Sequence, residues 1–165
     1  MNVLIVESPS KAKSINKYLA FIVLFLDILK GVVPFIIINL FFYEIEILLK
    51  VFICHFTILG HMFPVWLKFK GGKGVATYIG FLLGFNLYIG IAFLITWLII
   101  ALLSKYSSLS SLIATLVAPI FLIFVNINYH LSFFLFYLFL IIAIKHLENI
   151  KRLLNKTENK IKFSK

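Results

Sequence analysis

Long apolar stretches alternate with short polar ones along this chain. The apolar stretches lie at about residues 20–42, 47–63, 76–103, 109–125 and 129–145. A helix rises about 1.5 Å per residue, so about 20 apolar residues are enough to cross the hydrocarbon core of a bilayer. The pattern therefore predicts an all-α protein, a polytopic bundle of membrane helices.

The first helix is expected to begin before its apolar part. Ser8 can cap a helix whose first residue is Pro9, and such a helix would run directly into the apolar stretch. Asp27 and Lys30 share one face of it. Because a charge inside a membrane is costly, this pair marks either a polar, protein-facing site or an internal ion pair that serves packing.

The distribution of charge predicts the topology. Sixteen Lys and Arg against six Asp and Glu give a net charge of +10, and seven of the cations lie between Lys145 and Lys165. Three more are Lys68, Lys70 and Lys73. Positive loops remain in the cytoplasm, so we expect both basic segments and both chain ends there. The C-terminal segment is expected to form a basic interfacial helix on the inner leaflet.

An even number of crossings must separate the two basic segments. Since three apolar stretches lie between them, we split the stretch at 76–103 near Gly84 and Asn86 into a short helix and a returning one. About six membrane segments result, including short ones. A half-length helix is tolerated at membrane depth only when protein buries it, so the split predicts a packed bundle. The serine-rich turn at Ser104–Leu112 then returns to the cytoplasm.

Composition excludes several classes of protein. Hydrophobic residues make up 62% of the chain and charged ones 13%, which is too apolar for a soluble domain of 165 residues. The excess of cations therefore indicates membrane topology rather than nucleic-acid binding. Cys54 is the only cysteine, so no internal disulfide can form. Four histidines without Cys or carboxylates at ligand spacing argue against zinc, and we expect neither a metal nor a cofactor.

The loop KFKGGKG, residues 68–74, has the composition of an anion-binding loop. Its glycines let backbone N–H groups approach a phosphate, lysines flank them, and a helix is expected to begin just after them. It is not a Walker A loop, because Gly74 stands where that loop has Ser or Thr. The alternative is a flexible positive loop that only fixes the topology.

Further polar candidates lie near the same cytoplasmic side. His61 precedes the loop and His146 follows the last apolar stretch, where a lone histidine is more often structural. His146 and Asn149 are three residues apart, so they could jointly hydrogen-bond a polar substrate from one helical face. Ser108 lies in the serine-rich turn, where the simpler interpretation is a helix cap.

These segments together resemble the bacterial acyl-phosphate:glycerol-3-phosphate acyltransferases, integral membrane enzymes of phospholipid synthesis. LFLDILKGVVPF (24–35) resembles the family's second membrane helix, and GHMFPVWLKFKGGKGVAT (60–77) resembles its second motif. SKYSSLSSL (104–112) resembles its serine turn and KHLENIKRLLNKTENK (145–160) its third motif. Within that third motif, Lys156 stands where the family usually has glycine.

The resemblance, which covers roughly residues 21–162, implies a set of site residues. The residues similar to family active-site residues are Lys73, Ser108, His146 and Asn149, with Lys73 contacting phosphate. Those that the resemblance assigns to the substrate site are His61, Lys70, Gly71, Gly72, Gly74 and Glu158.

The resemblance also implies a reaction. A fatty acyl group passes from acyl phosphate to the 1-hydroxyl of glycerol 3-phosphate, which gives lysophosphatidic acid and inorganic phosphate. An acyl phosphate is already activated, so no covalent serine intermediate is required, and either His146 or the substrate's own phosphate acts as base. We expect a monomer in the bacterial inner membrane, whose partners are the two phosphate substrates and membrane lipid, with no nucleic acid.

The N-terminal segment differs from the family. In place of the family's first helix and first motif stands MNVLIVESPSKAKSINKYL, which resembles the start of the Toprim domain of type IA DNA topoisomerases, with Glu7 at that domain's catalytic glutamate. We interpret residues 1–19 as a foreign segment and 20–165 as a truncated acyltransferase membrane domain. The missing motif predicts impaired catalysis. The alternatives are a non-catalytic membrane remnant of a rearranged gene and, third, a small anion permease.

Overall fold

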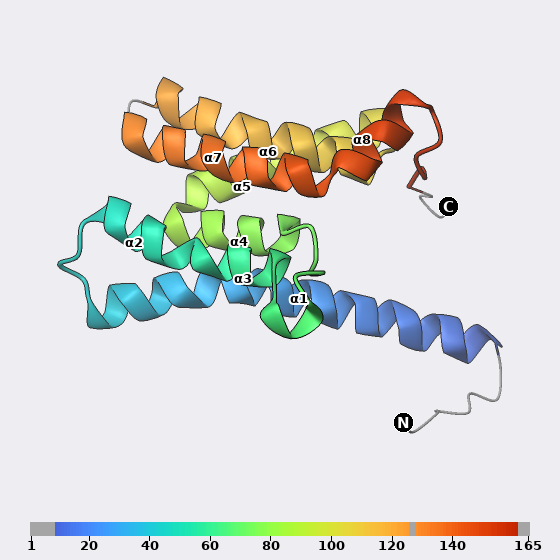
Figure 1. Ribbon diagram of the computed structural model, residues 1–165, viewed down its shortest axis with the longest axis horizontal. Helices are drawn as coiled ribbons and strands as arrows, with labels where there is room; N and C mark the ends of the chain where they lie inside the picture. Colours follow the sequence, from blue (N-terminus) through green and yellow to red (C-terminus); the bar gives the residue numbers. More distant parts are fainter. Residues whose placement is uncertain (1–8, 126–127, 162–165) are drawn as a thin grey trace.

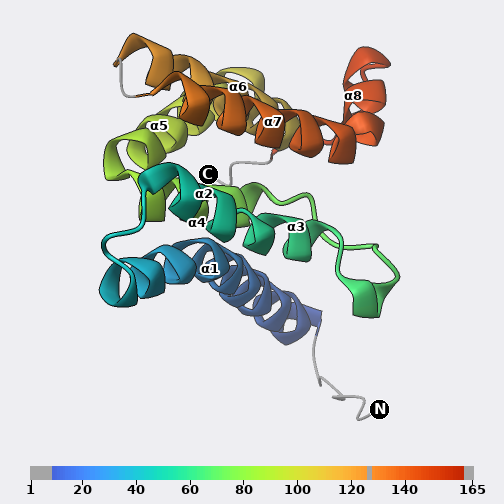
Figure 2. The same cartoon turned by 60° about the vertical axis from the view of Figure 1, so that its left-hand side comes forward.

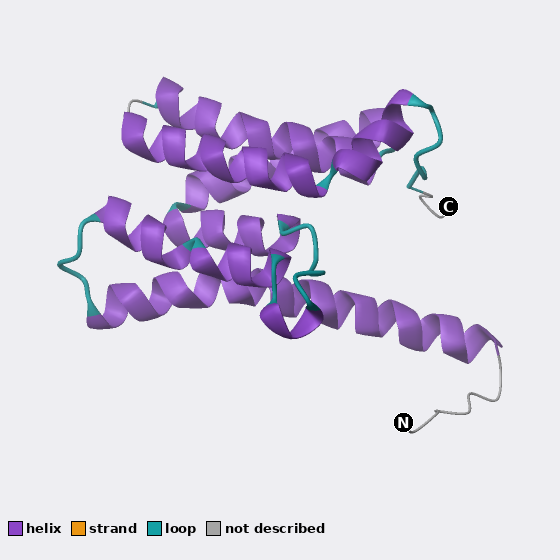
Figure 3. Cartoon of the chain, viewed as in Figure 1, coloured by secondary structure: helices purple, strands orange, loops and turns teal. Residues whose placement is uncertain are grey.

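The computed structural model describes residues 9–125 and 128–161, with side chains from Tyr18 onward within these ranges. Over the described residues the chain forms helices joined by loops, and no strand occurs among them (Figure 3). The elements are α1 (Pro9–Phe41), α2 (Ile47–Cys54), α3 (Phe56–Met62), the 3-10 turn η1 (Val65–Leu67), α4 (Val75–Phe85), α5 (Leu87–Ser104), α6 (Ser107–Phe124), α7 (Tyr129–Lys145) and α8 (Leu147–Leu154).

The helices confirm the predicted membrane bundle. Among the described residues, four stretches are long and apolar enough to cross a membrane: Tyr18–Phe41, Ile47–Leu67, Leu87–Ser104 and Ser107–Phe124. The pair α7 and α8 forms a fifth if it is taken as one span bent by 66°, and α4 is a shorter apolar helix. These segments agree with the predicted number of about six. α1 is already helical at Pro9, the first residue that the structure describes, so the predicted start of the helix with Ser8 as its cap stays a prediction.

The predicted break in the apolar stretch at 76–103 is also confirmed. Asn86 separates α4 from α5. Its side-chain oxygen accepts hydrogen bonds from the backbone N–H groups of Tyr88 and Ile89, which caps α5. A new helix therefore starts here, although hydropathy alone would join the two.

The helices form two groups, one above the other in the two views of Figures 1 and 2. One group consists of α1, α2, α3 and α4, and the other of α5, α6, α7 and α8. Within the groups, α1 packs against α4, α5 against α6 and α6 against α7. Contacts of α4 with α5 and of α2 with α7 join the groups. A site that draws residues from both groups must therefore lie between them.

α1 and α4 cross at two glycines. A Cβ at Gly31 would lie 2.1 Å from the carbonyl oxygen of Thr77, and one at Gly80 would lie 1.9 Å from the carbonyl oxygen of Ile28. Small residues let membrane helices approach until their backbones touch. The crossing therefore holds α1 closely against the helix that follows the glycine-lysine loop.

The short helix α4 is largely buried by the surrounding helices. Residues 77–82 are buried, and Tyr78, Phe81 and Leu82 expose none of their surface. The long helix α1, by contrast, exposes large apolar side chains from Tyr18 to Leu26, as a lipid-facing helix does. This burial of the half-length helix agrees with the prediction of a packed bundle.

The serine-rich segment is mostly helical rather than a turn. α6 already begins at Ser107, and Tyr106 occupies the N-cap position. Ser108 is therefore not the helix cap that the simpler interpretation assigned to it. The turn itself is short because Lys105 ends α5 in a left-handed conformation, with φ +62°.

The C-terminal helix is shorter than predicted. α8 ends at Leu154, and residues 155–161 form a non-helical segment, here called the C-terminal tail. Lys156 has φ +59°, a left-handed conformation that cannot continue an α-helix. The tail turns back toward the start of α6, where the backbone N–H of Ile161 donates a hydrogen bond to the carbonyl oxygen of Lys105 at 2.7 Å.

Candidate active site

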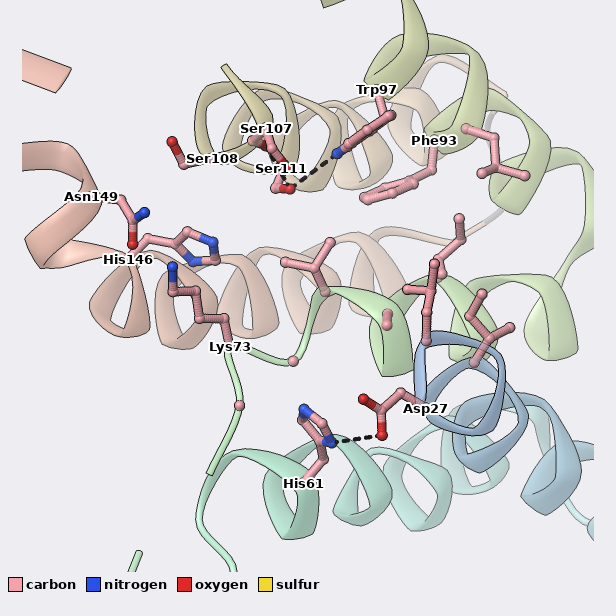
Figure 4. A pocket seen from close by; sticks show the side chains of 18 of the residues that line it. Asp27, His61, Lys73, Phe93, Trp97, Ser107, Ser108, Ser111, His146 and Asn149 are labelled. Carbon is pink, nitrogen blue, oxygen red and sulfur yellow. Dashed lines mark hydrogen bonds and ion pairs between the residues drawn. The ribbon is translucent and has the colours of Figure 1, made fainter. Parts of the chain in front are cut away.

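A cavity of about 730 Å³ lies between the two helix groups (Figure 4). His146, Asn149 and Ser108 gather on one side of it, and Phe93 and Trp97 lie on the other. All the predicted site residues line this cavity except Lys70, which is exposed on the loop, and Gly71. The polar or charged residues of its lining are Asp27, His61, Lys73, Ser107, Ser108, Ser111, His146, Asn149, Glu158 and Asn159.

The glycines of loop 71–74 allow it to pack on the end of α3. A Cβ at Gly71 would lie 2.1 Å from the carbonyl oxygen of His61, and one at Gly72 would lie 2.2 Å from His61 Nε2. Gly74 has φ +82°, a conformation that favours glycine, and directly precedes α4. All three glycines thus have a structural reason, and the anion cradle that they were expected to form stays a prediction.

Lys73 projects from this loop toward His146 (Figure 4). The two side chains come from different helix groups, because the loop precedes α4 and His146 follows α7. Both line the cavity. A cation and an imidazole therefore meet at a place that a phosphate group could reach.

His146 is held in one tautomer. Only 2% of its surface is exposed, and its Nδ1 lies 2.8 Å from the carbonyl oxygen of Ile142. A carbonyl oxygen can only accept, so a neutral ring carries its proton on Nδ1. Nε2 then has a lone pair with which it can accept a proton in the cavity.

Glu158 joins the C-terminal tail to two helices. Its Oε1 accepts hydrogen bonds from Ser108 Oγ and from Asn149 Nδ2, both at 2.7 Å, and its Oε2 accepts one from Arg152 Nε at 2.6 Å. Desolvation raises the pKa of this carboxyl group, but the three hydrogen bonds and the charge of Arg152 outweigh it and lower the pKa of Glu158 to about 2. Glu158 is therefore an ionised acceptor at neutral pH.

The contacts with Glu158 bear on two predicted catalytic residues. Ser108 donates its hydroxyl proton to a carboxylate whose pKa is about 2, so the partner is too weak a base to activate the hydroxyl as a nucleophile. The side-chain amide of Asn149 donates a hydrogen bond to the same carboxylate oxygen, Oε1 of Glu158. Ser108 and Asn149 line the cavity together with Glu158, and their catalytic roles stay predictions.

Asp27 forms a second charged cluster on the α1 side of the cavity. Its Oδ1 lies 2.7 Å from Lys30 Nζ and 3.3 Å from His61 Nδ1. The side chains of Asp27 and His61 are only 14% and 15% exposed. Asp27 and Lys30 therefore form an ion pair, and Asp27 also lines the polar cavity, while the role of the pair stays a prediction.

The sequence did not reveal the apolar wall of the cavity. Trp97 on α5 donates a hydrogen bond from Nε1 to Ser111 Oγ on α6 at 3.0 Å. In a chain this rich in apolar residues, hydropathy cannot separate a cavity-facing side chain from a lipid-facing one. The indole N–H of Trp97, which needs a partner inside a membrane, was the one available signal. The wall consists of Leu24, Ile28, Ile79, Phe93, Leu94 and Trp97.

The fold and the cavity together define a class of protein. It is a helical membrane protein in which an open cavity between the helix groups offers a lysine and a histidine beside an apolar wall. Such a cavity matches a molecule with a phosphate group at one end and a hydrocarbon chain at the other. Membrane proteins that act on phosphorylated lipids or their precursors have this requirement.

Comparisons with known proteins identify the family. The family model described as glycerol-3-phosphate acyltransferase matches residues 10–156. The glycerol-3-phosphate acyltransferase of Pelagibacter ubique is 46% identical over 149 residues, which cover 90% of this chain and 74% of that protein. The Bartonella quintana protein of the same name is 44% identical, over 88% of this chain and 70% of that protein. The chain belongs to the glycerol-3-phosphate acyltransferase family.

Solved structures agree with this assignment. The crystal structure of PlsY, an integral membrane glycerol 3-phosphate acyltransferase, in its glycerol 3-phosphate form superposes with a TM-score of 0.82 at 34% identity, over 91% of this chain and 74% of that one. Its lysophosphatidic acid form gives a TM-score of 0.81. The family match begins at residue 10, within the segment that we interpreted as foreign. The origin of residues 1–19 stays a prediction.

Proposed function

We propose that this protein transfers a fatty acyl group from acyl phosphate to glycerol 3-phosphate, forming lysophosphatidic acid and inorganic phosphate. The observation that carries the proposal is the cavity in which Lys73 faces His146 beside an apolar wall, in a chain of the acyltransferase family. The related structure in a glycerol 3-phosphate form supports that compound as the acceptor.

The chemistry follows from the groups at the polar side of the cavity. The acceptor's hydroxyl oxygen attacks the carbonyl carbon of acyl phosphate, the bond from that carbon to the phosphate oxygen breaks, and phosphate leaves with the electron pair. Nε2 of His146, or the departing phosphate, takes the hydroxyl proton. Lys73 stabilises the negative charge that develops on the acyl oxygen and on the leaving phosphate.

The apolar wall accounts for the acyl chain. Phe93, Leu94 and Ile79 line the cavity without any polar group of their own. A hydrocarbon chain that enters this side leaves water and contacts apolar side chains, which is favourable by about 0.8 kcal/mol per buried CH₂ group. The phosphate end then remains beside Lys73.

The protein is proposed to lie in the bacterial inner membrane with both termini in the cytoplasm. Basic segments stay on the cytoplasmic side, and the last turn of α8 carries Lys151 and Arg152. A monomer is proposed because the candidate catalytic residues of one chain already line one cavity, so the reaction requires no residue from a second copy. Labelling of a Lys160→Cys variant tests the orientation. Cys54, the other cysteine of that variant, is buried and should not react with the label. In intact cells with a permeable outer membrane, an impermeant maleimide should label the introduced cysteine only after the inner membrane is opened.

Phosphate release by the purified protein tests the reaction. Acyl phosphate and glycerol 3-phosphate together should yield inorganic phosphate and lysophosphatidic acid in equal amounts. Lys73→Ala should lower kcat/KM by about 10²- to 10³-fold, the usual effect of losing one group that stabilises transition-state charge. Lys68→Ala is the matched control, since Lys68 lies in the same loop but outside the cavity. Equal losses in the two variants would contradict the role of Lys73.

The same assay addresses the prediction of impaired catalysis. The Pelagibacter ubique relative, measured alongside, sets the rate that an active family member reaches under the same conditions. Comparable turnover by the two proteins would overturn the predicted impairment. The relatives support an acyltransferase, and they support neither a membrane remnant nor an anion permease.

A further inference from the structure

Two residues of different helices hold the ring of His61 between them. Its Nδ1 lies 3.3 Å from Asp27 Oδ1 on α1, and its opposite edge lies so close to Gly72 that a Cβ there would be 2.2 Å from Nε2. Figure 4 shows the two ring nitrogens on opposite sides, with only one joined to Asp27. The ring therefore fills the space between α1 and the loop that carries Lys73.

The contact with Asp27 favours a proton on one of the two ring nitrogens. A carboxylate can only accept, so a hydrogen bond between the two groups requires the proton on Nδ1 of His61. A carboxylate partner also fixes the orientation of an imidazole ring, because rotation of the ring would break the bond. Packing against Gly72 limits the space for the ring, whereas the contact with Asp27 is the one that selects its tautomer.

Asp27 is not needed to hold α1 in place. The glycine crossing with α4 and the burial of Phe35, which is 1% exposed, already attach this helix to the bundle. A carboxylate in an apolar helix is costly unless it is paired, and its partner Lys30 is 57% exposed on the side chain. The presence of a charge in this apolar helix therefore points to a role for Asp27 other than attaching the helix.

We propose that Asp27 is a positioning residue of the acyltransferase site: its carboxylate accepts the Nδ1 proton of His61 and so holds Nε2 against Gly72, next to Lys73. The inference rests on the proposed function for its effect on turnover. Its effect on the His61 ring can be measured separately. Displacing a charged group by about 1 Å can cost on the order of 100-fold in rate, so a misplaced Lys73 would be expensive.

Nitrogen NMR of the histidines tests the geometry without any assay of activity. The chain has four histidines, and His61→Gln identifies the resonances of His61. In the wild type, Nδ1 of His61 should be protonated. In Asp27→Asn, the amide can donate to the ring instead, so a neutral tautomer with the proton on Nε2 should appear. An unprotonated Nδ1 in the wild type would overturn the proposal.

Kinetics test the consequence. Asp27→Asn preserves the volume of the side chain and should lower kcat/KM by about 10- to 100-fold, as the loss of a residue that orients an imidazole does elsewhere. The thermal midpoint should not fall. Glu44→Gln is the matched control, since this exposed carboxylate lies in the turn beyond the other end of α1, and it should change kcat/KM less than 2-fold.

A double-mutant cycle separates positioning from a general structural role. If Asp27 acts through His61, Asp27→Asn should add less than 3-fold to the loss caused by His61→Gln. Multiplicative losses, or a loss that follows a fall in thermal midpoint, would overturn the inference while turnover by the wild type still supports the proposed function. If the wild type showed no turnover, the proposed function would fail, and the NMR result would still decide the geometry.

Discussion

Two carboxylates, Asp27 and Glu158, line the cavity, and they differ in the segments that they belong to. Asp27 pairs with Lys30 on its own helix and with His61 on α3. Glu158 accepts hydrogen bonds from Ser108, which is 50 residues away in sequence, and from two residues of α8. Asp27 thus lies on a helix that apolar packing already attaches to the bundle, whereas Glu158 lies in a tail without regular structure.

The difference teaches that the same chemical group has different consequences in the two places. Removing Asp27 should leave the helices where they are and change the orientation of one ring. Removing Glu158 should release the tail and leave buried polar groups without a partner. Effects on catalysis with little change in stability are therefore expected on the α1 side, and effects on both are expected on the tail side.

The largest effect is expected from Glu158→Ala. Asn149 and Ser108 are 5% and 7% exposed, and each buried polar group left unpaired costs about 1 to 3 kcal/mol. The free energy of unfolding should fall by that order, and turnover should fall with it because both partners line the cavity. Thermal unfolding in detergent and phosphate release measure the two effects.

Glu158→Gln is the matched variant for this comparison. It preserves an oxygen that can accept from Ser108 and Asn149, and it removes the charge that faces Arg152, whose side chain is 42% exposed. Since partly exposed ion pairs contribute little, the loss of stability should be less than half of that caused by alanine. Equal losses would show that the charge, and not the pair of buried hydrogen bonds, attaches the tail.

Acid should release the tail while it leaves the α1 side in place. The folded-state pKa of Glu158 is about 2, below the ordinary value of 4.5, so its stabilising contribution is complete above pH 4.5 and is lost as the pH falls toward 2. A spin label on Lys160→Cys should become more mobile over this range. Unchanged mobility down to pH 2, or the same change in a Glu158→Gln background, would contradict the role of the carboxylate.

The smallest effect is expected from Lys156→Gly in the same tail. Lys156 has φ +59°, a left-handed conformation that costs a side-chain-bearing residue about 1 to 2 kcal/mol. Glycine removes this cost but loses more entropy on folding, so the net gain in stability should be below about 1 kcal/mol. Asn155→Gly is the control, because Asn155 has φ −81° and glycine there should destabilise. A loss of stability in Lys156→Gly would contradict the expectation.

Much of the fold could be predicted from local patterns. The break at Asn86 follows from the requirement for an even number of crossings, and the structure adds that Asn86 caps the helix that starts there. The length of α8 could not be predicted in this way. Its sequence continues as basic and helix-compatible beyond Leu154, and the helix ends because the tail turns back to Ser108 and Lys105.

The candidate site was predictable in its members more than in its arrangement. Lys73, His146 and Glu158 line one cavity, as the motifs suggested, whereas Lys70 and Gly71 do not line it. Residue type and spacing singled out the glycine-lysine loop and the pair of His146 and Asn149, whereas Glu158 was named only through the resemblance to the family. The apolar wall had no such pattern, so its side chains could not be distinguished from those that face lipid.

The sequence by itself determined that this is a multi-pass helical membrane protein of the glycerol-3-phosphate acyltransferase family, since hydropathy, caps and motifs are properties of contiguous residues. The tertiary structure alone decided which groups meet: Asp27 with His61, and Ser108 with Glu158. Such contacts join segments far apart in the chain, and their geometry depends on how closely the helices pack, as at Gly31 and Gly80. No local pattern contains that distance.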